Sequence, residues 1–269
     1  MTGNLVSPIK NMHLAHSPDH QVLIIAHRGA SAYYPENTMI AFRKAVEMKA
    51  DMLELDIQLS RDGIPVIFHD DTLERCTGQI GKISDYALAE LKEMDAGSWK
   101  SPDFTGEQIP ALEEVLEFAK NKITVNIEIK PGSDSNGIAQ KALRLVKDYK
   151  MEHYVLFSSF DPEILIRLRT LSDTIPIALL YEKNNHRDRN VFDFISKYEI
   201  NAFNCSRWSI KKSWIKKLKR KHIPVLIYTV NSRWQMKKFI KQGITGIFTN
   251  KPDLLRSQLV VFNKAKQDK

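Results

Sequence analysis

The chain has 269 residues, of which 43% are hydrophobic and 27% are charged, with a formal net charge of +8. This composition is that of an ordinary globular protein, and no apolar run approaches the roughly 18 residues of a membrane-spanning helix. The two cysteines, Cys76 and Cys205, lie far apart, which excludes a disulfide framework and favours reduced thiols. Residues 1–20 are polar and lack the apolar stretch of a secretory signal, so we expect a flexible lead-in and a cytoplasmic protein.

After this lead-in, short apolar runs alternate with amphipathic stretches of helical length. The apolar runs are typical of buried parallel strands, and they cover residues 22–26, 52–57, 124–129, 154–157, 177–180, 201–204, 224–229 and 246–249. Helices are predicted over residues 38–48, 112–120, 137–149, 162–171, 191–197, 210–221, 233–242 and 252–263. This alternation predicts an α/β fold, a closed (β/α)₈ TIM barrel that forms a single domain over residues 21–269.

One connection is too long for a loop between a strand and a helix of such a barrel. It runs from about residue 60 to residue 110. The turn pair Asp62-Gly63 predicts a hairpin that returns along residues 64–68, and a short helix is expected near residues 87–94. We therefore expect a small inserted subdomain, at about residues 70–110, over the barrel mouth.

Carboxylates stand at the ends of the second and third barrel strands. Residues two apart in a strand share a face, so Glu54 and Asp56 point the same way, and Glu128 and Lys130 do so on the next strand. In a barrel these ends meet at the rim that carries active sites. Three converging carboxylates require protonation or a cation, and oxygen ligands favour Mg²⁺ or Ca²⁺. One alternative is a His-rich zinc site. The other is an internal ion pair of Glu54 and Asp56 with Arg28 or Lys130, which would leave Glu128 unpaired.

Two histidines flank these carboxylates. His27 ends the first strand, and His69 follows the expected hairpin. With pKa values that are ordinarily near ~6.5, they are candidates for the base and the acid of a phosphate ester hydrolysis. Arg28 can grip phosphate oxygens with two donors, and Lys130 adds a point charge. Asp70 either orients His69 or caps a turn.

The string Pro35-Glu36-Asn37-Thr38 precedes a predicted helix. Its simplest interpretation is helix-start chemistry, with Asn37 as the N-cap residue. Gly29 is expected to permit a close backbone approach after the first strand.

Taken together, these motifs closely resemble the glycerophosphodiester phosphodiesterase family over roughly residues 22 to 257. The resemblance rests on order and spacing, since each motif alone is weak. The motifs are His27-Arg28-Gly29, Pro35-Glu36-Asn37-Thr38, Glu54-Leu55-Asp56, Asp62-Gly63, His69-Asp70, Asn126-Ile127-Glu128-Ile129-Lys130, Tyr228-Thr229-Val230-Asn231 and residues 246–253.

The resemblance implies hydrolysis of small glycerophosphodiesters to glycerol 3-phosphate and an alcohol. It also implies one divalent cation, Mg²⁺ or Ca²⁺, and a set of site residues. Within this set, His27 is our choice for the base and His69 for the acid. The implied residues are His27 and His69 for acid–base catalysis, Glu54, Asp56 and Glu128 for the metal, and Arg28, Lys130, Tyr228 and Phe160 for the substrate. Tyr228 stands where the family often has Trp, and Asn250 where it often has Asp.

Residues 205–241 contain twelve Lys or Arg and no Asp or Glu. The simplest interpretation is the solvated outer face of two helices, and the alternative is weak contact with an anionic membrane surface. No recognition motif favours nucleic acid. The basic stretch, with Trp208 and Trp214 expected to be exposed, motivates a second hypothesis, a lysophospholipase D. A third is a catalytically silent barrel that binds phosphodiesters or anionic surfaces. We expect a monomer or a homodimer.

Overall fold

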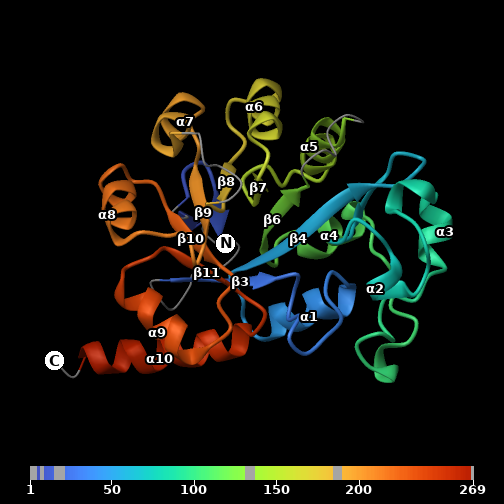
Figure 1. Cartoon of the computed structure of the whole chain (residues 1–269), viewed down its shortest axis with the longest axis horizontal. Helices are drawn as coiled ribbons and strands as arrows, with labels where there is room; N and C mark the ends of the chain where they lie inside the picture. Colours follow the sequence, from blue (N-terminus) through green and yellow to red (C-terminus); the bar gives the residue numbers. More distant parts are fainter. Residues whose placement is uncertain (1–4, 7–8, 15–21, 131–136, 184–189, 268–269) are drawn as a thin grey trace.

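A computed structural model describes residues 5–6, 9–14, 22–130, 137–183 and 190–267 of the chain. In this part of the chain, eight parallel strands form one sheet in the order β3-β11-β10-β9-β8-β7-β6-β4, and the β3–β4 pairing closes it into a barrel (Figure 1). The predicted TIM barrel is confirmed. The barrel strands are β3 (Leu23–His27), β4 (Met52–Leu59), β6 (Thr124–Ile129), β7 (Val155–Ser159), β8 (Ile177–Tyr181), β9 (Ala202–Ser206), β10 (Val225–Tyr228) and β11 (Gly246–Thr249).

Helices lie outside the strands and bury their apolar faces against them (Figure 1). Local capping fixes several helix starts; the Asp161 side chain, for example, accepts a hydrogen bond from the Glu163 amide, and Pro162 occupies the first turn. No described helix is both long and apolar enough to span a membrane. The outer helices are α1 (Met39–Glu47), α4 (Leu112–Ala119), α5 (Ile138–Asp148), α6 (Pro162–Leu171), α7 (Val191–Lys197), α8 (Lys212–Arg220), α9 (Arg233–Lys241) and α10 (Pro252–Gln267).

Alternation along each strand separates two environments. On β4, Leu53, Leu55 and Ile57 pack outward among the helices, whereas Met52 belongs to a separate cluster inside the barrel. The interior is therefore apolar at the N-terminal ends of the strands, and Glu54 and Asp56 follow toward the C-terminal ends.

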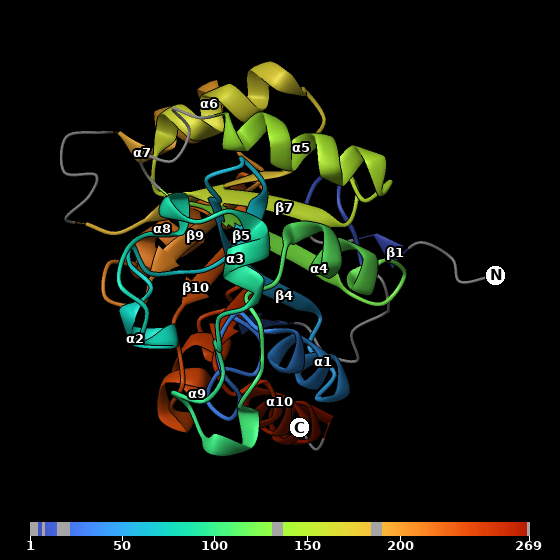
Figure 2. The same cartoon turned by 90° about the vertical axis from the view of Figure 1, so that its right-hand side faces the viewer.

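Part of the expected lead-in covers the apolar floor. Ile9 and Met12 are completely buried, in one cluster with floor residues such as Leu23 and Leu226. Two short strands, β1 (Leu5–Val6) and β2 (His13–Leu14), pair with each other nearby. Figure 2 shows β1 on the side of the barrel opposite α2.

The long connection after β4 forms the expected hairpin and further short elements. β5 (Pro65–Ile67) pairs antiparallel with β4. The helices that follow lie to one side of the barrel (Figures 1 and 2); they are α2 (Glu74–Thr77), η1 (Ile83–Asp85), α3 (Leu88–Lys92) and η2 (Pro102–Phe104). This segment, which we call the insertion, has a small apolar cluster of its own, consisting of Val66, Phe68, Leu73, Cys76, Ile83, Leu91, Ala96 and Ile109.

Candidate active site at the C-terminal rim of the barrel

Strand register brings three carboxylates together at the rim. The β3–β4 pairing places His27 opposite Glu54, and the β4–β6 pairing places Asp56 opposite Glu128. Oxygen atoms of the three acidic residues lie within 4.8 Å of one another, and all three residues are buried. The predicted convergence of these side chains is therefore present.

Two cations contact this cluster. Lys130 Nζ lies 3.0 Å from both Asp56 Oδ1 and Glu128 Oε1, and Arg28 Nε lies 3.4 Å from Asp56 Oδ2. The ion pairs with Arg28 and Lys130 that were considered as an alternative to a metal site are therefore present. The expectation that they would leave Glu128 unpaired is wrong, because Lys130 also contacts Glu128. Three carboxylates against two cations leave an excess of negative charge in a buried space, which is costly unless it is neutralised.

The electrostatics of the cluster match this excess. Burial and the neighbouring Asp56 charge raise the pKa of Glu128 to about 7, and they also raise the pKa of Glu54 well above its ordinary value. For Asp56, the Lys130 and Arg28 charges outweigh burial and lower the pKa. Two of the three groups therefore hold protons in conditions where a free carboxyl would be ionised.

The donor set fits a hard divalent cation. Its three ligand groups are carboxylates, the oxygen donors that Mg²⁺ and Ca²⁺ prefer. His27 Nε2 lies 4.0 Å from Glu54 Oε2, at the edge of the cluster. A bound cation would remove the cost of ionising Glu54 and Glu128 side by side.

One ring nitrogen of His27 faces the carboxylate cluster, and the other faces the neutral side-chain amide of Asn250. Its Nδ1 lies 2.8 Å from Asn250 Oδ1, an acceptor, so Nδ1 carries the proton and Nε2 is left with its lone pair. Burial, together with the Arg28 charge, lowers the pKa of His27 to about 4. The ring is therefore neutral near pH 7, as a general base must be.

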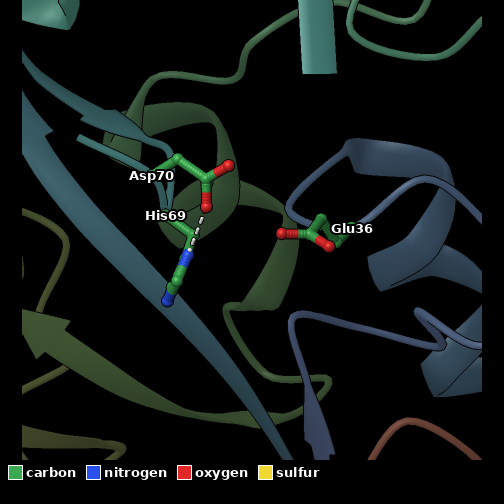
Figure 3. A group of neighbouring side chains, drawn as sticks. All are labelled: Glu36, His69 and Asp70. Carbon is green, nitrogen blue, oxygen red and sulfur yellow. Dashed lines mark hydrogen bonds and ion pairs between the residues drawn. The ribbon is translucent and has the colours of Figure 1, made fainter. Parts of the chain in front are cut away.

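His69 is oriented by its neighbour. Its Nδ1 lies 2.7 Å from Asp70 Oδ1, and the other ring nitrogen points away from that carboxylate (Figure 3). Gln58 on β4 donates to the backbone oxygens of Phe68 and Asp70, at 3.1 and 2.7 Å, and so fixes the segment that carries the ring. Of the two interpretations of Asp70, the structure therefore shows the one in which Asp70 orients His69.

The turn after β3 shapes the Arg28 position. Arg28 adopts a left-handed backbone conformation, with φ of 57°, and its amide donates to Glu54 Oε2 at 2.9 Å. The next residue, Gly29, also has positive φ, and a Cβ there would lie 2.7 Å from the Ala41 backbone of α1. The expected close approach at Gly29 is therefore present, and it seats α1 beside the rim.

Two residues of the segment before α1, Glu36 and Asn37, bind side chains of the site, and only Thr38 caps the helix. Thr38, not Asn37, is the N-cap residue, so the expected role of Asn37 is wrong. Asn37 instead donates from Nδ2 to Asp56 Oδ2 at 3.0 Å, and Glu36 accepts from Arg28 Nη1 at 2.9 Å. Thr38 is the N-cap residue because its side-chain hydroxyl accepts a hydrogen bond from the backbone N–H of Ala41. The side-chain amide of Asn37 is therefore available to orient a buried carboxylate.

A cavity of about 180 Å³ opens above these groups. Phe160 and Tyr228 form part of its wall, with ring centroids 5.9 Å apart and nearly perpendicular planes, and the Tyr228 hydroxyl donates to the Tyr181 backbone oxygen at 2.8 Å. All the predicted site residues except Asp56 line the cavity, and Asp56 contacts the lining residues Arg28 and Lys130. The lining also includes Asn126, Ser158, Leu180, Thr229 and Phe248.

Some contributors were not predicted from the sequence. Asn126 Nδ2 donates to Ser158 Oγ at 2.8 Å, which makes a polar interior layer next to Glu54. Asn126 stands two residues before Glu128, so the alternation that located Glu128 also places Asn126 on the inner face. Asn250 was noted only as a departure from the family pattern, and its contact with His27 follows from the closure of the barrel, which brings β11 beside β3.

The basic stretch lies mainly on the outer surfaces of α8 and α9, where its Lys and Arg residues from 211 onward are exposed. Trp208 is 76% exposed. The expected exposure of Trp214 is wrong, because its ring packs on Tyr181 and Phe192 with centroids 5.3 and 5.5 Å away. This stretch therefore contributes two exposed indoles: Trp208, which follows β9 beside the rim, and Trp234 on α9, which is 69% exposed.

Comparisons with known proteins agree with this geometry. A model described as the glycerophosphoryl diester phosphodiesterase family matches residues 27–254. A glycerophosphodiester phosphodiesterase of Caldanaerobacter subterraneus subsp. tengcongensis is 36% identical over 237 residues, which cover 87% of this chain and 96% of that protein. A glycerophosphodiester phosphodiesterase of Bacillus subtilis is 32% identical over 268 residues, which cover 94% of this chain and 87% of that protein.

A solved structure shows the same architecture. A phosphodiesterase of Oleispira antarctica, in complex with the product sn-glycerol-3-phosphate, matches with a TM-score of 0.79 and 30% identity. The match covers 88% of this chain and 96% of that chain.

Proposed function

The chain belongs to the glycerophosphoryl diester phosphodiesterase family, and from this premise we propose that its rim site hydrolyses glycerophosphodiesters to sn-glycerol 3-phosphate and an alcohol with the help of one divalent cation. The family resemblance found in the sequence is confirmed. The protein is a glycerophosphodiester phosphodiesterase, a phosphoric diester hydrolase.

One observation carries the finer proposal. Three buried carboxylates, two histidines, an arginine and a lysine come together in and directly beside a single cavity from four separate segments of the chain. A purely structural ion-pair network would not bring three buried carboxylates against only two cations beside the neutral imidazole of His27. This supports Glu54, Asp56 and Glu128 as the residues that would hold Mg²⁺ or Ca²⁺, whose bound form would polarise a phosphoryl oxygen.

The other residues have complementary roles in this proposal. Arg28 and Lys130 bind the phosphate oxygens, and Tyr228 and Phe160 contact the organic part of the substrate. His27 Nε2 accepts the proton of the attacking nucleophile as it bonds to phosphorus. His69 gives a proton to the alcohol oxygen as its bond to phosphorus breaks, so the two proton transfers balance.

The direct test measures release of glycerol 3-phosphate. Glycerophosphocholine and glycerophosphoethanolamine would be incubated with protein treated with EDTA, and Mg²⁺ or Ca²⁺ would then be restored. We expect turnover to stop on chelation and to return with the cation. Turnover that persists after exhaustive dialysis against chelator would reject the metal dependence, and no turnover with either cation would reject the proposed substrates.

A second candidate activity is cleavage of the same bond in lysophospholipids. It is supported by the apolar wall formed by Phe160, Leu180 and Phe248, and by the exposed Trp208 after β9. An acyl chain could follow that wall toward Trp208. Turnover of lysophosphatidylcholine and glycerophosphocholine at equal concentrations decides between the two activities, because a strong preference for the acylated substrate favours the lysophospholipase D.

A further inference from the structure

A guanidinium from the insertion lies between two carboxylates at the edge of the active site. Arg75, on α2, donates from Nη2 to Glu36 Oε1 at 2.7 Å and from Nη1 to Glu36 Oε2 at 3.2 Å. The adjacent edge of the guanidinium, which shares Nη2, contacts Asp70, with Nη2 at 3.0 Å from Oδ1 and Nε bonded to Oδ2. One planar side chain thus binds two carboxylates, each with a pair of bonds.

Each of these carboxylates also holds a residue of the site. Asp70 Oδ1 lies 2.7 Å from the Nδ1 atom of His69, and Glu36 Oε1 accepts from Arg28 Nη1 at 2.9 Å. Arg75 is therefore the shared partner of the two groups that orient the proposed acid and the proposed phosphate-binding arginine.

The geometry explains why a cation is needed at this place. Glu36, His69 and Asp70 are neighbours (Figure 3), and their ligand atoms lie within 4.8 Å of one another. The two carboxylates would therefore repel each other without a positive charge between them. Such a cluster resembles a metal site, but the Arg75 guanidinium already supplies the charge and occupies both carboxylates. Hydrogen bonds from Arg75 accordingly lower the pKa of Asp70.

Arg75 is itself positioned by the insertion. Its guanidinium lies 5.3 Å from the centroid of the Trp99 ring, and the neighbouring Cys76 is buried in the insertion's apolar cluster. The side chain remains 43% exposed. Exposed ion pairs contribute little to folding stability, so two paired contacts at this exposure serve orientation more than stability.

We propose that Arg75 is a positioning residue for the hydrolysis, which holds the His69 ring and the Arg28 guanidinium in register through Asp70 and Glu36. The insertion thereby supplies a part of the active site that the barrel strands lack. This inference rests on the proposed function, in which His69 protonates the leaving alcohol.

The test compares Arg75→Gln with a matched control, Arg61→Gln. Arg61 is also exposed, at 55%, and pairs with Glu90 at 2.6 Å and with the backbone oxygen of Asp85, so it matches Arg75 in charge and exposure without contacting Asp70 or Glu36. Two substrates are used: glycerophosphocholine, whose alkoxide needs a proton, and the p-nitrophenyl ester of glycerol 3-phosphate, whose phenolate leaves without one.

For Arg75→Gln we expect kcat on glycerophosphocholine to fall about 10- to 100-fold, as for misplacement of a catalytic group. On the p-nitrophenyl ester kcat should fall less than about threefold, while KM rises for both substrates through Arg28. Melting temperatures of both variants should lie within about 3 °C of the parent protein. Arg75→Lys, which keeps the charge but not the paired donors, should show an intermediate loss on glycerophosphocholine.

Three outcomes would overturn the inference. They are equal losses on both substrates, a kcat for Arg75→Gln equal to that of Arg61→Gln, or full activity of Arg75→Lys. Turnover by the parent protein is measured first, because its absence on both substrates would instead reject the proposed function itself.

Discussion

Cation binding at Glu54, Asp56 and Glu128 should tighten about tenfold between pH 6 and pH 8. The magnitude follows from Glu128, whose buried carboxyl has a pKa raised to about 7. About one molecule in eleven has this group ionised at pH 6, and about ten in eleven at pH 8. Because a carboxyl must lose its proton to bind a metal, the apparent affinity follows the ionised fraction, and the raised pKa of Glu54 acts in the same direction.

The same shift affects the metal-free protein. Between the pKa of an unfolded Glu and about 7, the native state holds more protons at Glu128 than the unfolded state does. Stability without metal should therefore be highest at the low end of this interval and should decrease as pH rises through it.

Isothermal titration calorimetry with Mg²⁺ and with Ca²⁺, in buffers of different ionisation enthalpy, measures both the Kd and the protons released. Glu128→Gln is the control, since it binds more weakly but has no proton to lose at this position. A Kd that is equal at pH 6 and pH 8, with no proton release at pH 6, would refute the reasoning.

Three further substitutions test separate parts of the argument. His69→Ala should lower kcat on glycerophosphocholine by at least ~10²-fold, and a smaller loss in a glycerol 3-phosphate assay would remove it as the acid. Arg28→Lys loses the paired donors toward phosphate, so KM should rise by about tenfold or more, and an unchanged KM would contradict its role. Ile9→Ala should lower the free energy of unfolding in urea by about 2–5 kcal/mol, because Ile9 is completely buried on the barrel floor. An unchanged urea midpoint would show that this packing is dispensable.

The sequence determined the barrel and the set of side chains on its rim. Apolar runs of strand length, separated by amphipathic helices, predict parallel strands buried on both faces, and the two-residue repeat then fixes which side chains point inward. Glu54, Asp56 and Glu128 follow directly from this repeat, because their positions depend on local backbone geometry and on the closure of adjacent strands.

Contacts between segments distant in sequence could not be predicted in this way. The residues around Asn37 predict that it caps the following helix. In the structure Asn37 instead donates to Asp56, and Thr38 is the N-cap residue. The lysines around Trp214 predict an exposed side chain, but its ring packs on Tyr181.

For Asn37 and Thr38 two neighbouring side chains could fill the same local role, and for Trp214 the local pattern allowed an exposed ring; in both cases contacts with distant segments decide the outcome. Periodicity therefore sets the face on which a strand residue lies. Only the folded chain decides which loop residue meets which carboxylate, since that depends on how segments distant in sequence, such as the Arg75 helix and the turn after β3, come together in space.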